Sequence, residues 1–272
     1  MIIVQLSDLH VRPYGKPCNR VNESNMLTER AFRAVARMQP KPDAILITGD
    51  LTDCGLVEEY AELQKLLAHY FDGKVFVIPG NHDRRENFIA ALKPPVAPTG
   101  FVDYAVDLGP VRLVMLDTLL PGKSAGELRP EQLQWLDETL AQAPATPTMI
   151  AMHHPPFLAS ILHMDKITLQ NADAFRDVIA RHAQVDRIIC GHYHRQITAR
   201  VGNALATIAP STGVQVAFDL HPQAASAFVK EPGQYVVHVW TPESGFVSHT
   251  VYVEDFEGPY PFVLDAEYPG ES

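Results

Sequence analysis

The chain has 272 residues, a hydrophobic fraction of 46% and a formal net charge of −10 at pH 7. This length allows a substantial core, as one large domain or as one domain with an appendage. The acidic balance argues against a nucleic-acid polymer as partner, because such partners require basic patches. No apolar stretch approaches the roughly 18 residues that a membrane-spanning helix needs, so we expect no membrane association.

The cysteines and the N-terminus predict a cellular location. Three cysteines, odd in number and far apart, favour reduced thiols. The N-terminus enters strand-like sequence at once and lacks a basic leader, so a signal peptide is not expected. We therefore expect a cytoplasmic protein.

Five short apolar runs each end at residues that bind metals. Runs of this kind, rich in β-branched residues, are typical of strands buried on both faces. Because strand ends converge on one crevice in an open α/β sheet, we expect one shared metal site. The runs at 2–6, 44–49, 75–80, 149–152 and 187–191 precede, in order, Asp8 with His10, Asp50, Asn81 with His82, His153 with His154, and His192 with His194.

The candidate ligands outnumber the needs of one ion. A zinc ion usually takes four ligands, so a larger set predicts two ions that share a bridging carboxylate. Asp50 is the natural bridge because it stands alone in its segment. The mixed oxygen and nitrogen set suits two divalent ions of Mn, Fe, Co or Zn. The seven candidates are Asp8, His10, Asp50, Asn81, His153, His192 and His194.

The spacing within two pairs of candidates favours a common direction. Asp8 and His10 are two residues apart, as are His192 and His194. In extended backbone, such a spacing points both side chains of a pair to the same side. We therefore expect each pair to face the metal site from an extended segment.

Helical patterns lie between the apolar runs. Apolar residues recur at helical spacing over 25–38 and 56–71, Pro130 opens a third helix, and Asp173 is placed to cap a fourth. The segments 112–116 and 204–208 are further strands. This alternation predicts an α/β fold with layered sheets and helices.

The C-terminal part of the sequence differs in pattern. Residues 235–240 and 246–253 alternate around a short turn, which predicts a β-hairpin. We expect a catalytic domain over 1–213 and a C-terminal extension over 214–272 that caps the core or joins subunits in a homodimer or an assembly of dimers. A proline-rich aromatic tail follows the hairpin and contains Phe256, Tyr260, Phe262 and Tyr268.

The motifs together resemble the calcineurin-like metallophosphoesterase superfamily. They are Asp8-Leu9-His10, Gly49-Asp50-Leu51-Thr52-Asp53, Gly80-Asn81-His82-Asp83, His153-His154 and Gly191-His192-Tyr193-His194. Within it they look most like bacterial class III cyclic nucleotide phosphodiesterases and the related glycerophosphodiesterases. The resemblance implies a four-layer α/β/β/α sandwich with a C-terminal β-hairpin extension.

The resemblance also implies how the ligands are shared. Asp8, His10, Asp50 and His194 would hold the first ion. Asp50, Asn81, His153 and His192 would hold the second ion.

A site of this kind predicts a phosphodiesterase for small diesters such as 3′,5′-cyclic AMP or glycerophosphodiesters. Two close divalent ions lower the pKa of a shared water, whose hydroxide attacks phosphorus. Besides Asp50, His82 is a catalytic candidate that stabilises or protonates the leaving alkoxide, with Asp83 orienting its ring. His154 is expected to support the ligands rather than bind metal. We expect Asn81, His82, Asn19, Arg20 and Asn22 to contact the substrate, and Asp53 and Asp117 to be structural.

Four other functions compete with a phosphodiesterase. A general phosphomonoesterase is the main alternative, and a metal-binding scaffold without activity is the next. The His-x-His-x-Asp-His string of zinc β-lactamases is absent early in the sequence. A protein Ser/Thr phosphatase would carry arginine directly after Gly-Asp-x-x-Asp, where this chain has Cys54.

Overall fold

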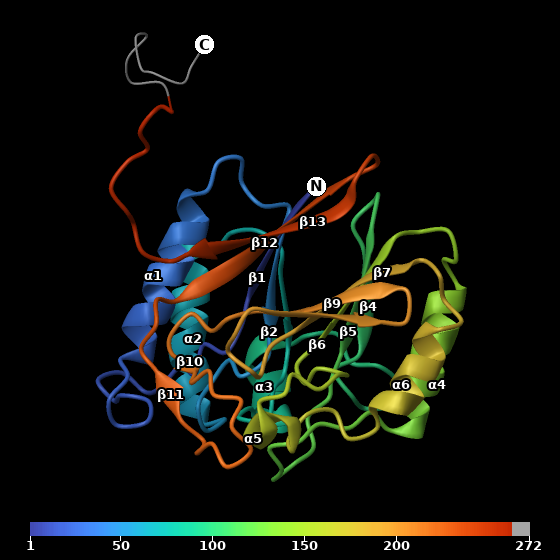
Figure 1. The fold of residues 1–272 in the computed structure, drawn as a ribbon, viewed down its shortest axis with the longest axis horizontal. Helices are drawn as coiled ribbons and strands as arrows, with labels where there is room; N and C mark the ends of the chain where they lie inside the picture. The colour runs from blue at the N-terminus through green and yellow to red at the C-terminus, as the bar shows by residue number, and fades with distance from the viewer. Residues whose placement is uncertain (263–272) are drawn as a thin grey trace.

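Two β-sheets face each other at the centre of the computed structural model, which describes residues 1–262. The first sheet has the order β13-β12-β1-β2-β3, and the second has the order β4-β5-β6-β7-β9-β8. Figure 1 shows α1 and α2 on one side of the sheets and α4 and α6 on the other. The mixed α/β class and the layered arrangement expected from the sequence are therefore confirmed.

The first sheet combines strands from the N-terminal and C-terminal parts of the chain. Its strands are β1 (Ile2–Leu6), β2 (Ala44–Thr48), β3 (Val75–Ile78), β12 (Gln234–Thr241) and β13 (Gly245–Tyr252). The helices α1 (Ser24–Arg37), α2 (Val57–Tyr70) and α3 (Arg85–Leu92) share a hydrophobic core with this sheet.

The second sheet lies in the middle of the sequence. Its strands are β4 (Tyr104–Asp107), β5 (Arg112–Leu116), β6 (Thr148–Met152), β7 (Val185–Cys190), β8 (Ile197–Val201) and β9 (Ala204–Ile208). The helices α4 (Pro130–Ala141) and α6 (Ala172–Ile179) share a second hydrophobic core with this sheet. Three short elements complete the fold: α5 (Leu162–Asp165), β10 (Gln215–Val216) and β11 (Phe228–Val229).

The central strands are buried on both faces, as their unbroken apolar character predicts. In β5, Leu113 and Met115 belong to the core that contains the first sheet, whereas Val114 and Leu116 pack with α4 and α6. Neighbouring residues of a strand point to opposite faces, so both faces must be apolar when both are covered. The strands β1, β2, β6 and β7, which precede candidate ligands, are largely buried as well.

Parallel pairing brings the carboxyl ends of the strands together. β1, β2 and β3 are parallel to one another, and so are β5, β6, β7 and β9. The loops that leave β1, β2, β3, β6 and β7 therefore start at the same edges of the two sheets. Within residues 1–262, no helix combines the length and the apolarity needed to cross a bilayer.

The predicted C-terminal hairpin is confirmed as β12 and β13. β12 pairs with β1 over four residue pairs, from Ile2 with Val239 to Gln5 with Val236. The hairpin thus completes the first sheet, although the domain division at residue 213 stays a prediction. Of the aromatic tail, Tyr268 lies outside the described residues.

Candidate metal centre

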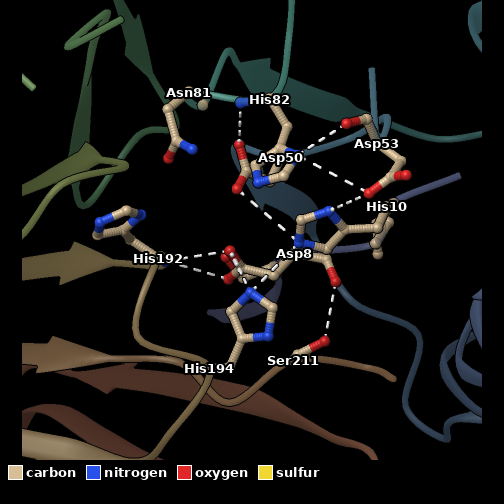
Figure 2. Close-up of polar contacts among 12 residues, drawn as sticks. Asp8, His10, Asp50, Asp53, Asn81, His82, His192, His194 and Ser211 are labelled. Carbon is tan, nitrogen blue, oxygen red and sulfur yellow. Dashed lines mark hydrogen bonds and ion pairs between the residues drawn. The ribbon is translucent and has the colours of Figure 1, made fainter. Parts of the chain in front are cut away.

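The loops at the carboxyl ends of five strands bring all seven candidate ligands into one place. Asp8 and His10 follow β1, Asp50 follows β2, and Asn81 follows β3. His153 follows β6 directly, while His192 and His194 follow β7. Figure 2 shows Asp8, His10, Asp50 and His194 with their polar atoms turned toward one another.

Most of these residues have left-handed backbone rather than the extended backbone expected for the pairs. The φ angles are 55° at Asp8, 47° at His10, 48° at Asp50, 73° at His192 and 50° at His194. Residues other than glycine rarely adopt such angles, which cost of order 1–3 kcal/mol each and cluster at functional sites. The sharp turns let strand ends aim successive side chains at one point, which extended segments would not do.

Asp8, His10, Asp50 and His194 form the first ligand group. His194 Nε2 lies 3.3 Å from Asp8 Oδ1 and 3.2 Å from His10 Nε2. His10 Nε2 in turn lies 3.8 Å from Asp50 Oδ2. Metal–ligand bonds are about 2.0–2.2 Å long. Two atoms that bind the same ion are therefore separated by distances like those measured between these side chains.

Asp50, Asn81, His153 and His192 form the second ligand group. His153 Nε2 lies 3.3 Å from Asp50 Oδ2 and 3.2 Å from Asn81 Oδ1. The His192 ring is 5.1 Å from the His153 ring, centre to centre. The same oxygen of Asp50 therefore lies beside donors of both groups.

The other oxygen of Asp50 is already engaged. Asp50 Oδ1 accepts a hydrogen bond of 2.8 Å from the backbone N–H of His82 (Figure 2). This bond fixes the carboxylate so that Oδ2 points between the two groups. Gly80 makes this packing possible, because a Cβ there would lie 2.8 Å from His153 Nε2 and would also collide with Asp50.

Three of the four histidines in the two groups have one ring nitrogen held by a backbone carbonyl. His153 Nδ1 lies 2.8 Å from the carbonyl of Thr48, and His194 Nδ1 lies 2.8 Å from that of Val214. His192 Nε2 lies 3.1 Å from the carbonyl of Ile167. A nitrogen that donates to a carbonyl fixes the tautomer and leaves the other nitrogen as a metal donor.

The buried carboxylates are charged as a cation site requires, whereas the pKa of the His153 ring is raised. Burial would raise the pKa of Asp50, but the imidazoles of His153, His82 and His10 outweigh it and hold that pKa well below its ordinary value. Burial holds the pKa of His192 well below its ordinary value, so this ring is neutral. Against burial, Asp50 and Asp8 raise the pKa of His153 to about 9. The carboxylates therefore stay ionised and attract positive charge.

The residues present fit two divalent ions. Both groups combine carboxylate or amide oxygen with imidazole nitrogen, a donor set typical of Mn, Fe, Co and Zn sites. His154 offers no free nitrogen to either group. Its Nδ1 lies 2.8 Å from Thr118 Oγ1, and its Nε2 lies 3.2 Å from the carbonyl of Ser124.

Asp53 connects His10 and His82, although the sequence indicated only a structural role for it. Its Oδ1 lies 3.3 Å from His10 Nδ1, and Cys18 donates to the same oxygen at 3.2 Å. Its backbone carbonyl accepts a hydrogen bond of 2.7 Å from His82 Nδ1. The position of Asp53, three residues after Asp50 in one motif, is the signal that could have indicated this role.

Asp83 differs from the expectation that it orients the His82 ring. Its buried carboxylate accepts hydrogen bonds from the backbone N–H groups of Leu51 at 3.1 Å and Gly80 at 2.9 Å, and from Tyr60 Oη at 2.8 Å. The side chain thus turns away from the His82 ring, toward the loop after β2. Asp83 fastens the loop of Asp50 to the loop of Asn81, and Asp53 holds the ring instead.

A cavity of about 270 Å³ opens beside both ligand groups. Asn19 and Asn22, two of the predicted substrate residues, line it together with Asn81 and His82. Arg20 is exposed, and it is not among the described residues that line the cavity. Other residues that line the cavity were not predicted, because they belong to none of the sequence motifs. They include Ser124, His163, Ser211 and Phe228.

Solved structures of low sequence identity share this fold. A dimetal phosphatase from Danio rerio is 17% identical, with a TM-score of 0.63, and the match covers 93% of this chain and 99% of that one. The purple acid phosphatase PPD1 from yellow lupin is 12% identical, with a TM-score of 0.71, over 93% of this chain and 51% of that one.

Relatives of higher identity match almost the whole chain. A probable glycerophosphodiester phosphodiesterase, GpdQ, from Arcobacter nitrofigilis is 36% identical over 96% of this chain and 97% of its own. The 3′,5′-cyclic adenosine monophosphate phosphodiesterase CpdA from Pseudomonas aeruginosa is 31% identical over 80% of this chain and 78% of its own. Residues 1–196 match the calcineurin-like phosphoesterase family. The chain therefore belongs to the calcineurin-like phosphoesterase family, a family of hydrolytic enzymes.

Proposed function

We propose that this enzyme is a dinuclear metal-dependent phosphodiesterase that hydrolyses small phosphodiesters, either 3′,5′-cyclic nucleotides such as cyclic AMP or glycerophosphodiesters. The observation that carries the proposal is the place of Asp50 Oδ2, 3.8 Å from His10 Nε2 and 3.3 Å from His153 Nε2. One oxygen between two donor groups is the geometry of a bridging ligand. The names of the relatives support the substrate class.

The two ions are assigned to the two groups of donors. Asp8, His10, Asp50 and His194 would hold the first ion, and Asp50, Asn81, His153 and His192 would hold the second. Two such ions, when bound, activate a water for attack on phosphorus and neutralise charge on the phosphate oxygens. Mn, Fe, Co and Zn all suit these donors.

His82 acts on the leaving group in this proposal. Its Nδ1 is held by the carbonyl of Asp53, so its Nε2 remains for a group in the cavity that the residue lines. Burial lowers the pKa of His82, but Asp50 and the Asp53 carbonyl outweigh burial and raise it. A protonated Nε2 can donate its proton to the departing alkoxide, because an alkoxide is a poor leaving group unless it is protonated. Asn81 directs its Oδ1 toward His153 and leaves its amide N–H groups for a phosphate oxygen.

The cavity is better matched to a diester than to a monoester. Among the described lining residues there is no lysine or arginine to meet the second charge of a monoester dianion. Arg12 approaches Cys54 Sγ to 2.8 Å, yet its guanidinium is committed to Glu59 at 2.6 Å and Asp53 at 3.4 Å. Cys54 stands where a protein phosphatase carries an arginine. Among the described lining residues, no lysine or other arginine takes the place of that arginine.

We expect kcat/KM for bis(p-nitrophenyl) phosphate to exceed that for p-nitrophenyl phosphate at least about tenfold, a difference near 1.4 kcal/mol in transition-state stabilisation. Both substrates release the same phenolate, so release of colour measures both at equal metal loading. Equal or reversed values would indicate a general phosphomonoesterase.

Metal binding is expected to release protons near neutral pH. Because the pKa of His153 is raised to about 9, this ring carries a proton at pH 7 that it must lose before it binds an ion. Metal affinity should therefore rise as the pH rises toward 9 and fall as the pH falls. Titration calorimetry in two buffers of different ionisation enthalpy measures the number of protons. Equal heats in both buffers at pH 7 would contradict the expectation.

We propose that the exposed aromatic residues after the hairpin assemble the enzyme as a homodimer in the cytoplasm. Phe256 is 66% exposed and Tyr260 is 62% exposed, areas that a partner copy would cover. Truncation after Val253 is then expected to give a soluble monomer in light scattering, beside a dimer for the full chain. Truncation after Gly233 removes β12 from β1, so it should give insoluble protein. An unchanged mass after the shorter truncation would contradict the dimer.

A panel of substrates tests the proposed function. The enzyme is loaded with Mn, Co or Zn and assayed for hydrolysis of cyclic AMP, glycerophosphoethanolamine and bis(p-nitrophenyl) phosphate. Hydrolysis of at least one natural diester is expected, and a requirement for metal should accompany it. Absence of turnover in every arm would favour a non-catalytic scaffold.

A further inference from the structure

One wall of the cavity is apolar and is built by α5 and the short ribbon of β10 and β11. Met164, Ile167, Val216 and Phe228 line this wall, and Phe228 is 39% exposed. No predicted ligand or catalytic residue lies in it. His163 and Ser226 are polar members of the same wall. In Figure 1, α5, β10 and β11 lie at the same lower end of the molecule.

His163 is held at a fixed place relative to the metal ligands. Its neighbour Met164 is 7% exposed and packs in the core of the second sheet. Asp165 accepts a hydrogen bond of 3.0 Å from Tyr193 Oη, and Tyr193 separates His192 from His194. The carbonyl of Ile167 lies 3.1 Å from His192 Nε2. The turn that carries His163 is thus attached to the ligand loop through the residues that directly follow His163.

The hydrogen bonding of His163 indicates which nitrogen carries the proton. Its Nδ1 is buried and has no hydrogen-bond partner among the described residues. A buried N–H without a partner costs more than a buried lone pair, so the neutral ring places its proton on Nε2. Nε2 is not among the buried unpaired atoms and has no protein partner in the described chain. His163 therefore presents an N–H donor from a residue that lines the cavity.

We propose that His163 and Phe228 bind the ester group that stays on the phosphate, and that His163 Nε2–H donates to an acceptor on that group. This inference rests on the proposed phosphodiesterase function and extends it to substrate selection. The preferred group has an apolar or planar face for Phe228 and a carbonyl or hydroxyl oxygen for His163. A small alkyl group satisfies neither contact.

Two substrates with one leaving group test the contact. Thymidine 5′-(p-nitrophenyl phosphate) offers a planar group with carbonyl acceptors, and methyl p-nitrophenyl phosphate offers neither. Removal of one hydrogen bond in His163→Ala should lower kcat/KM for the thymidine ester roughly tenfold, through KM, and leave the methyl ester within about twofold. His163→Gln, which restores an N–H donor, should recover most of the loss. His249→Ala, an exposed histidine on β13, is the control.

The outcomes separate the two proposals. An equal loss for both esters, or no loss for either, would overturn the role of His163 while the phosphodiesterase function stands. Binding of the product thymidine 5′-phosphate, measured by calorimetry, gives a readout that needs no turnover. Weaker product binding in His163→Ala, with an inactive wild-type enzyme, would support the binding role and overturn the function. Unchanged product binding in that variant would overturn the binding role.

Discussion

Asp50→Ala is expected to lose both ions and at least roughly 10³-fold in turnover, because one oxygen of Asp50 serves both donor groups. Oδ2 lies near His10 in one group and near His153 in the other, so the substitution removes a ligand from both groups. Elemental analysis of the metal-loaded variant and its kcat with bis(p-nitrophenyl) phosphate measure the two losses.

The fold should survive the substitution at Asp50. The side chain lies beyond the end of β2 and contributes no apolar surface to either core. Circular dichroism checks this, and Asp107→Ala, which removes an exposed carboxylate far along the chain, is the matched control. Two full equivalents of metal in Asp50→Ala would refute the bridging assignment.

His82→Ala is expected to keep both ions and lose roughly 10² to 10⁴ in rate for esters of poor leaving groups. The ring is 41% exposed and is directed by the Asp53 carbonyl, and the hydrogen bond from His82 to Asp50 comes from its backbone N–H. The loss should be smaller for p-nitrophenolate, which leaves with little need of a proton. Rates for an alkyl diester and for bis(p-nitrophenyl) phosphate, with metal content, provide the measurement.

A control separates this effect from a general effect of losing an imidazole. His221→Ala removes an exposed histidine that does not line the cavity and should leave both rates unchanged. If His82→Ala loses the same factor for good and poor leaving groups, His82 positions the phosphate and does not donate the proton.

The strands that carry the site were predictable because they are buried on both faces. The run at residues 2–6 coincides with β1, and the run at 44–49 extends one residue beyond the end of β2. β8 was missed because it alternates between half-buried and exposed residues, a weak pattern in five residues. Helix α3 was missed because only Phe88 among its eight residues is fully buried, which leaves no apolar stripe.

The site was predictable in its residue types but not in its local geometry. Asp, His and Asn at strand ends indicate metal binding from their chemistry alone. The left-handed backbone at Asp8 and His10 depends on how several loops pack together in the fold. The two-residue spacing of Asp8 and His10 in the sequence does not predict it. For the same reason we expected Asp83, the neighbour of His82 in sequence, to orient the His82 ring, whereas its carboxylate accepts hydrogen bonds from Leu51 and Gly80.

Specificity was the least predictable property because it depends on the course of loops. Residues 11–25 contain several polar side chains, and only the fold shows that Asn19 and Asn22 line the cavity. His163 and Phe228 lie 65 residues apart in sequence numbering, and only the fold brings both to the lining of one cavity. No motif in the sequence relates the two residues.

Anomalous diffraction from crystals of the manganese-loaded enzyme tests the shared oxygen most directly. Two peaks are expected about 3.5–4 Å apart, both within bonding distance of Asp50 Oδ2. Asp8, His10 and His194 should surround the first peak, and Asn81, His153 and His192 the second. A single peak at full manganese loading, or two peaks of which only one contacts Asp50, would contradict a dinuclear centre bridged by this residue.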